Sequence, residues 1–92
     1  MSINTSFIIP HKGREDMLIE TLTSIAGLTT PKEQYEVVLV SQNKEISNTL
    51  SAFIETVNLR VVYNDENNTI SHSRNLGADL ATGEYLAFLD AD

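Results

Sequence analysis

The chain has 92 residues and no cysteine, which suits one small domain and excludes disulfides and thiolate metal sites. Hydrophobic residues make up 41% of it and charged residues 21%, as in an ordinary globular protein. Its formal net charge of −7 argues against DNA or RNA as a partner, because phosphate backbones are bound by clustered Lys and Arg.

The first ten residues lack the basic start and the long apolar run of a signal peptide. No apolar stretch approaches the roughly 20 residues that cross a membrane as a helix. The sequence therefore predicts no membrane segment in these 92 residues, and the expected location is the cytoplasm.

The first two predicted elements are a strand and a helix. Residues 6–9 form a short apolar run closed by Pro10, which predicts a strand. Residues 14–28 carry apolar side chains at helical spacing, and Gly27 is a natural stop for that helix. The stripe consists of Leu18, Leu22 and Ile25.

The middle of the chain repeats this alternation. Residues 35–40 are apolar and rich in β-branched side chains, which predicts a second strand. A second helix is expected over residues 46–57, followed by a third strand over residues 59–63. The apolar stripe of that helix consists of Ile46, Leu50, Phe53, Ile54 and Val57.

The last predicted pair is a third helix and a fourth strand. Ser71 is expected to cap the helix, which ends near Thr82 and Gly83. Residues 84–89 are then expected to form the fourth strand.

The predicted order is β-α-β-α-β-α-β. Strands that alternate with helices imply an α/β fold of the Rossmann-like, three-layer kind, with a mainly parallel four-stranded sheet and right-handed crossovers. Ligands of such sheets bind beyond the carboxyl ends of the strands. The polar residues beyond the four strands are His11, Lys12 and Gly13; Ser41, Gln42 and Asn43; residues 64–68; and Asp90 and Asp92.

The two acids after the fourth strand are the sharpest candidate site. Residues i and i+2 of a strand point to the same side, so Asp90 and Asp92 are expected to lie close together. Two neighbouring carboxylates repel each other unless a positive charge lies between them, and a hard divalent cation fits that position. The alternative is a turn that carries two solvated acids.

Four sequence blocks carry a family resemblance. They read FIIP at residues 7–10, YEVVLV at 35–40, SRNLG at 73–77 and TGEYLAFLDAD at 82–92. Together they resemble the family 2 inverting glycosyltransferases of the GT-A fold, over essentially the whole chain. The last two blocks are the most specific, because Arg-Asn-x-Gly and then Gly-Glu-Tyr precede an apolar strand ending in Asp-x-Asp.

The resemblance implies a role for several residues. Pro10, His11 and Lys12 line the nucleotide pocket, and Arg74 approaches the base or the diphosphate. Asp90 lies near the ribose or the metal. Asp92 binds Mn²⁺ or Mg²⁺. Alternatively, Arg74 pairs with a carboxylate such as that of Asp79, and Lys12 is a solvated loop residue.

The chain departs from the family pattern after the second strand. The family usually carries Asp-Asp or Asp-Gly-Ser there, and its first Asp recognises the base. Here Ser41, Gln42 and Asn43 offer neutral donors and acceptors, so the sequence leaves open whether the nucleotide is UDP or another one. Ser41 and Gln42 remain candidate nucleotide contacts. A second departure is Thr69, which stands where the family often has glycine.

The resemblance also sets the expected domain content. Residues 1–92 correspond to the half that binds the nucleoside diphosphate sugar, and the acceptor-binding half with its general base is not among them. We therefore expect the 92 residues alone not to transfer sugar. Without later strands, residues 84–89 are expected to form an apolar sheet edge that pairs two copies into a homo-oligomer.

Two other functions stay open at this point. A non-catalytic nucleotide-binding or assembly module is favoured by the neutral Ser41-Gln42-Asn43 sequence. A sugar nucleotidyltransferase shares the general layout but needs a loop rich in glycine and arginine after the first strand. Residues 11–14 are sparse in both, so this function ranks third.

Overall fold

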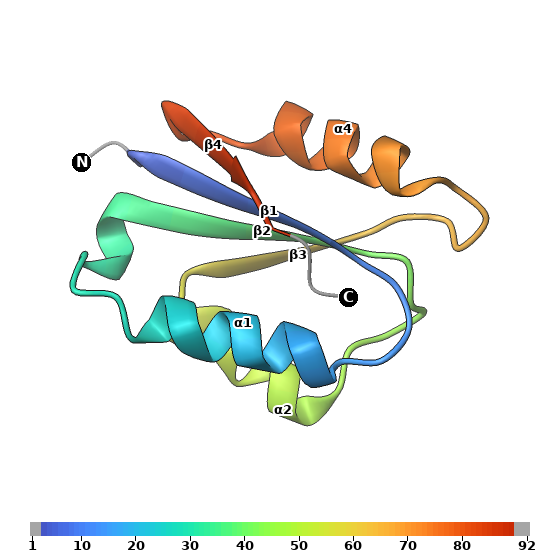
Figure 1. Ribbon diagram of the computed structural model, residues 1–92, viewed down its shortest axis with the longest axis horizontal. Helices are drawn as coiled ribbons and strands as arrows, with labels where there is room; N and C mark the ends of the chain where they lie inside the picture. The colour runs from blue at the N-terminus through green and yellow to red at the C-terminus, as the bar shows by residue number, and fades with distance from the viewer. Residues whose placement is uncertain (1–2, 90–92) are drawn as a thin grey trace.

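The computed structural model describes residues 3–89 and contains one parallel sheet. Its strands are β1 (Thr5–His11), β2 (Tyr35–Ser41), β3 (Leu59–Tyr63) and β4 (Tyr85–Phe88). Its helices are α1 (Asp16–Ala26), α2 (Asn48–Ser51), α3 (Phe53–Thr56) and α4 (Ile70–Leu80), with a 3-10 turn η1 (Lys32–Gln34). The strand order is β3-β2-β1-β4, with α1 and α2 on one face and α4 on the other (Figure 1). The predicted α/β fold with a parallel four-stranded sheet is confirmed.

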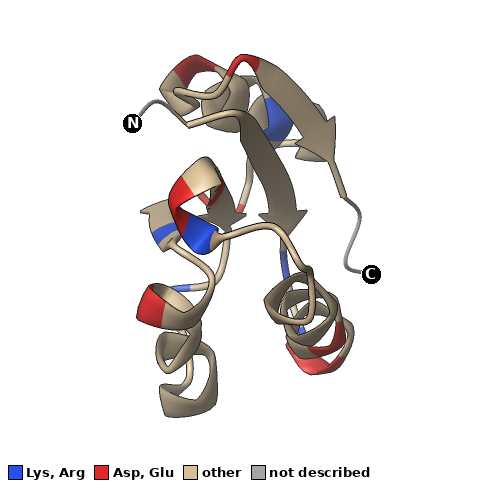
Figure 2. Cartoon of the chain, turned by 90° about the vertical axis from the view of Figure 1, so that its left-hand side faces the viewer, with Lys and Arg blue, Asp and Glu red and all other residues tan. Residues whose placement is uncertain are grey.

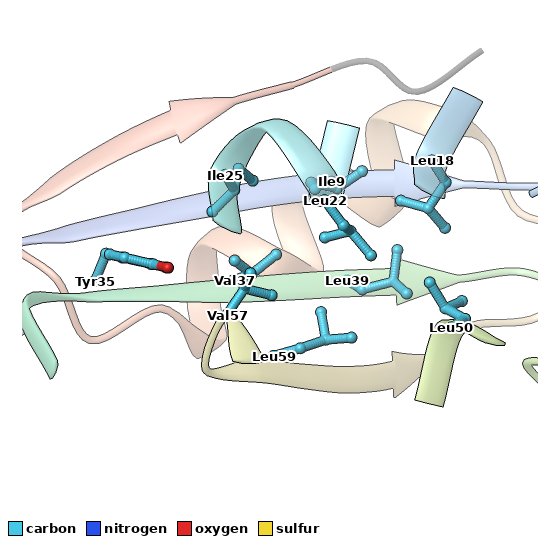
Figure 3. Close-up of a cluster of buried hydrophobic side chains, with 10 residues drawn as sticks. All are labelled: Ile9, Leu18, Leu22, Ile25, Tyr35, Val37, Leu39, Leu50, Val57 and Leu59. Atoms are coloured by element: carbon cyan, nitrogen blue, oxygen red, sulfur yellow. The ribbon is translucent and has the colours of Figure 1, made fainter. Parts of the chain in front are cut away.

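The pairing of β1 with β2 is the centre of the sheet. All seven residues of β1 pair in register with β2, from Thr5 opposite Tyr35 to His11 opposite Ser41. Every residue of β2 is buried, as expected for a strand covered on both faces. The main hydrophobic cluster lies between this pair and the helices α1 and α2 (Figure 3).

Helix α4 lies close against the opposite face of the sheet. Ile8, Val38 and Val40 form a smaller buried cluster there. Gly77 allows the close approach, because a Cβ atom at that position would lie 2.5 Å from Cγ2 of Ile8 and 3.1 Å from Cγ2 of Val40. The glycine is therefore required by packing against two side chains of the central strands.

We predict that Gly77→Ala destabilises the protein by about 1–3 kcal/mol, the usual cost of overpacking a core. Gly27→Ala is the matched control, because its Cβ would meet no atom closer than 3.5 Å and its φ of −83° suits any residue. Urea unfolding of both variants measures the difference. Equal free energies of unfolding for the two variants would contradict the packing described.

Three local predictions were wrong. The first strand does not end at Pro10 but continues to His11. Proline is tolerated at this position because the backbone groups of successive β1 residues point alternately toward β2 and toward β4. The carbonyl of His11 points toward β2, where it accepts from the N–H of Gln42. Ile8 instead faces β4, where its carbonyl accepts from Leu89 N–H. The backbone nitrogen of Pro10, which carries no hydrogen, therefore points to the β4 side of the strand, beyond the end of β4.

The caps and the second helix also differ from expectation. Thr69 caps α4 by accepting from the N–H of His72, so Ser71 lies inside the helix. The predicted helix over residues 46–57 is two short helices that meet at Ala52. The first of them is capped by the side chain of Ser47, which accepts from Leu50 N–H.

A buried carboxylate joins three elements at the amino end of the sheet. Glu36 accepts hydrogen bonds from Ser6 Oγ at 2.6 Å and from the backbone N–H of Thr82 at 2.6 Å. The guanidinium of Arg60 lies 3.4 Å away. Burial raises the pKa of Glu36, but these donors together outweigh it and the pKa lies below its usual value. The Glu36 carboxylate thereby fixes the turn that leads from α4 into β4.

The same network makes a pH prediction. A lowered pKa in the folded state means that Glu36 stabilises the protein above its unfolded pKa of about 4.3, and this contribution is lost as the pH falls through the folded value. Glu36→Gln should reduce the free energy of unfolding by about 1–3 kcal/mol near neutral pH, because a neutral amide accepts more weakly than a carboxylate and turns its own N–H donors toward the donors around it.

Urea unfolding between about pH 3 and pH 7 is the measurement, since it spans the relevant titration. The difference between wild type and variant should shrink as the pH falls. Glu84→Gln, at an exposed position, is the control and should show no such trend. A difference that is constant over the whole range would contradict the network.

Candidate functional site

The loops after β1, β2 and β3 meet at the carboxyl edge of the sheet. They comprise residues 12–15, 42–47 and 64–69. Backbone bonds set them side by side: the carbonyl of His11 accepts from Gln42, and the carbonyl of Ser41 accepts from Asn64. The predicted gathering of polar residues at this edge is therefore confirmed for the three loops.

Most of the predicted contact residues point into the protein. Pro10 and Ser41 are fully buried, and His11 and Gln42 are 1% and 3% exposed. Lys12 is exposed, and its ammonium donates to the carbonyl of Glu66 at 2.6 Å. The described structure therefore offers the Lys12 side chain, rather than the four buried ones, to a ligand.

Arg74 lies on α4, which covers the opposite face of the sheet from α1 (Figure 1). Its side chain is half-buried. The preceding turn of the helix carries His72 and Ser73, both of which contact the Asn64 amide. Arg74 thus projects from a helix whose first turns are tied to the loop after β3.

The side chain of Gln42 is hydrogen-bonded to the loop after β3 and to α4. Its Nε2 donates to the carbonyls of Asp65 at 2.9 Å and Asn68 at 2.6 Å. Its Oε1 accepts from Ser73 Oγ at 3.2 Å. A primary amide has two N–H donors, so both are used within the protein.

Asn43 makes the corresponding contact with the loop after β1. Its Oδ1 accepts from the N–H of Gly13 at 2.9 Å, and its Nδ2 donates to the Gly13 carbonyl at 2.8 Å. Gly13 has a φ of 95°, a conformation that favours glycine. Farther along the same two loops, the Glu15 carboxylate accepts from both the N–H and the hydroxyl of Ser47. These contacts are not predictable from the sequence, because nothing in the residue types reveals which amide faces which loop.

Charge at this edge is mixed. Three of the six Lys and Arg residues lie on these loops, namely Lys12, Arg14 and Lys44. Acidic residues are spread over several elements of the molecule (Figure 2). Arg14 is already paired with Asp16 at 2.5 Å, so the net attraction of the edge for a diphosphate is small without further positive charge.

An open pocket of about 250 Å³ lies between the loops after β2 and β3. It is lined by Gln42, Asn43, Lys44, Tyr63, Asn64, Asp65 and Glu66. A larger hollow of about 400 Å³ lies near Lys32 and Asn58, at the opposite end of the strands. We regard the smaller pocket as the relevant one, because ligands of parallel sheets bind at the carboxyl ends.

The predicted metal ligands Asp90 and Asp92 lie outside the residues that the structure describes. Within residues 3–89, no group of three or more acidic or histidine side chains could hold a metal ion. Leu89, the last described residue, donates its N–H to the carbonyl of Ile8. The described part of the chain therefore ends while still bonded to the central strand β1.

Comparison with known proteins decides the family. The family model described as glycosyl transferase family 2 matches residues 6–92. The chain belongs to this family. The resemblance carried by the four sequence blocks is thereby confirmed, and the loops described above are those of a family 2 glycosyltransferase.

Individual family members and solved structures agree with this assignment. The glycosyltransferase AglE of Haloferax volcanii is 33% identical over 92 residues, and the match covers 95% of this chain and 30% of AglE. A crystal structure of S. aureus TarS in complex with UDP is 28% identical with a TM-score of 0.83, covering 98% of this chain and 28% of that one.

A more distant structure supports the fold alone. The mannosyltransferase PcManGT of Pyrobaculum calidifontis, in complex with GDP-Man and Mn²⁺, is 24% identical with a TM-score of 0.75. The match covers 100% of this chain and 28% of PcManGT. This chain thus spans less than a third of the length of these three proteins. In its described part, none of the helices combines the length and hydropathy needed to cross a membrane.

Proposed function

We propose that this chain binds a nucleoside diphosphate sugar at the carboxyl edge of its sheet, and that the whole protein transfers the sugar to an acceptor hydroxyl with inversion. The family match over residues 6–92 carries the proposal. The UDP bound to TarS, whose structure resembles this chain, supports a nucleotide ligand.

The proposed roles follow from where the residues lie. Lys12 and Arg74 supply positive charge from the loop after β1 and from α4. Asp90 and Asp92 hold Mn²⁺ or Mg²⁺ directly after β4, and their carboxylates are ligands that both ions accept. Such an ion supplies charge neutralisation for the leaving diphosphate. Pro10, His11 and Ser41 support the pocket from within.

We propose that the group that deprotonates the acceptor lies outside residues 1–92. General base catalysis contributes roughly 10²–10⁴-fold to a transfer reaction. We propose that this base lies in the acceptor-binding half, as the family resemblance implies, and that residues 1–92 by themselves are inactive. No role for nucleic acid is proposed, given the net charge of −7.

A non-catalytic nucleotide-binding or assembly module is the second candidate. One observation favours it: the position after β2 carries Gln42, whose amide is spent on internal contacts. A module of that kind would bind a nucleotide without transferring sugar from it.

We predict that binding of UDP or GDP requires Mn²⁺ or Mg²⁺. The reason is that the carboxyl edge carries mixed charge and the net charge is −7, so a diphosphate needs a counter-ion. Calorimetric titration in the presence of the metal should give saturable heat that disappears in EDTA. Asp92→Asn should weaken binding.

Glu84→Gln is the matched control, because Glu84 is an exposed acid directly before β4, at the amino end of the sheet. It removes the same charge without touching the proposed metal site, so its affinity should equal that of wild type. Equal nucleotide affinity with and without EDTA, or equal losses in both variants, would remove the metal from the proposal.

We further propose that a second copy of the chain pairs with the edge of β4. Tyr85, Leu86 and Phe88 are 65%, 44% and 48% exposed, so apolar side chains stand on both faces of this edge strand. The N–H groups of Tyr85 and Leu89 bond β1, so those of Leu86 and Phe88 face away from it. An apolar edge with outward donors is a template for another strand.

Leu86→Pro removes one outward N–H and should therefore shift a dimer to monomer, as measured by light scattering on a size-exclusion column. Leu28→Ala, at an exposed apolar position outside β4, is the control and should leave the dimer intact. A wild-type monomer at high protein concentration, or a dimer that survives Leu86→Pro, would contradict edge pairing.

A further inference from the structure

The residue pair after β2 holds both neighbouring loops. Gln42 bonds the loop after β3 through two hydrogen bonds and Ser73 of α4 through a third, and Asn43 bonds Gly13 in the loop after β1 through two. We call this pair the Gln42–Asn43 clamp. The side chains leave the same strand end in opposite directions along the sheet, because β2 lies between β1 and β3.

The surroundings of the Gln42 amide demand a donor. Two backbone carbonyl oxygens, those of Asp65 and Asn68, converge on Nε2 at 2.9 and 2.6 Å. A carboxylate in this place would face both oxygens with its own lone pairs, in a position that is 3% exposed. An acidic residue therefore does not fit the loop as it is folded here.

The loop itself is built around the same contacts. The Asn64 side chain accepts from the N–H of Asp65 and from Nδ2 of Asn68. The N–H of Asn68 donates to the carbonyl of Asp65, which also accepts from Gln42. Removing the Gln42 donor would thus remove two of the hydrogen bonds that hold this loop, while the bond from Asn64 N–H to the Ser41 carbonyl and the contact of Lys12 with the Glu66 carbonyl remain.

We infer that Gln42 is a positioning residue, which holds the loop of residues 64–69 against the sheet, and that the protein does not read the nucleotide base through this side chain. The inference rests on the proposed function, because it concerns recognition at the same edge. It replaces the base contact expected at Gln42 from its place in the sequence.

A first experiment tests the clamp without any ligand. Gln42→Glu keeps the side-chain size but replaces the donor with an acid, and Gln42→Met keeps the size without polar atoms. Burial against two carbonyls raises the pKa of the new glutamate above its ordinary value of about 4.3. The penalty of its charge is then present at high pH and disappears as the pH falls through the raised value.

As the pH is lowered from about 8 to about 5, the melting temperature of Gln42→Glu should therefore rise relative to that of Gln42→Met. Over this range the new glutamate gains a proton and can donate to one of the two carbonyls. Gln34→Glu, a half-buried glutamine at the opposite edge, is the control for added charge. A difference in melting temperature between Gln42→Glu and Gln42→Met that does not change with pH would contradict the role of Gln42 in holding the loop.

A second experiment tests base recognition in the full chain. Dissociation constants for UDP, CDP, GDP and ADP are measured with Mn²⁺ for wild type, Gln42→Met and Asn43→Asp. A positioning role predicts that Gln42→Met weakens all four by the same factor and leaves their ranking unchanged. A selective loss for one base of more than about tenfold, the size of one lost hydrogen bond, overturns it.

The two experiments fail separately. If wild type binds none of the four nucleotides, the proposed function is wrong, while the melting comparison still decides whether Gln42 holds the loop. If nucleotides bind and the melting gap is independent of pH, the proposed function stands and the positioning role of Gln42 is wrong.

Discussion

The parallel pairing of β1 with β2 is the constraint on which the rest of the structure depends. Seven residues of each strand pair without interruption, and the next backbone bond, from Gln42 to His11, extends the pairing into the loops. Because both strands run in the same direction, their carboxyl ends bring the following loops together. The helices pack on the two faces of this pair, and β4 and β3 add to its edges. The site is a consequence of this arrangement.

The loops at the carboxyl edge are held mainly by side-chain amides, and Lys12 and Glu15 add charged contacts to Glu66 and Ser47. Gln42, Asn43 and Asn64 are neutral, and each can both donate and accept, so one residue bonds backbone groups of either kind. A carboxylate can only accept. Glu36, at the other end of β2, is surrounded by donors and suits an acid for that reason. The choice between acid and amide at the two ends of β2 thus follows the backbone groups that each side chain meets.

The sequence predicts the fold well because its apolar spacing is regular. Leu18, Leu22 and Ile25 are all buried as the helical stripe required, and the four strands lie where the apolar runs predicted. Local ends were predicted less well, since several polar residues near α4 could act as its cap. Thr69 rather than Ser71 is selected by where the loop after β3 turns, which depends on Asn64 and Gln42 across the sheet. The sequence likewise identifies the carboxyl edge but not which of its side chains point inward, because that depends on contacts between loops distant in the chain.

Mapping of backbone amide signals during titration with UDP and Mg²⁺ tests the central claim, that this family 2 glycosyltransferase binds its nucleotide at the carboxyl edge. Binding at this edge should give saturable shifts in residues 12–15, 42–47 and 64–69. The amides of Asn4, Gln34 and Asn58, at the opposite edge, should not move. Saturable shifts around the hollow near Lys32 and Asn58, with none at the three loops, would place the nucleotide at the opposite end of the sheet and contradict binding at the carboxyl edge.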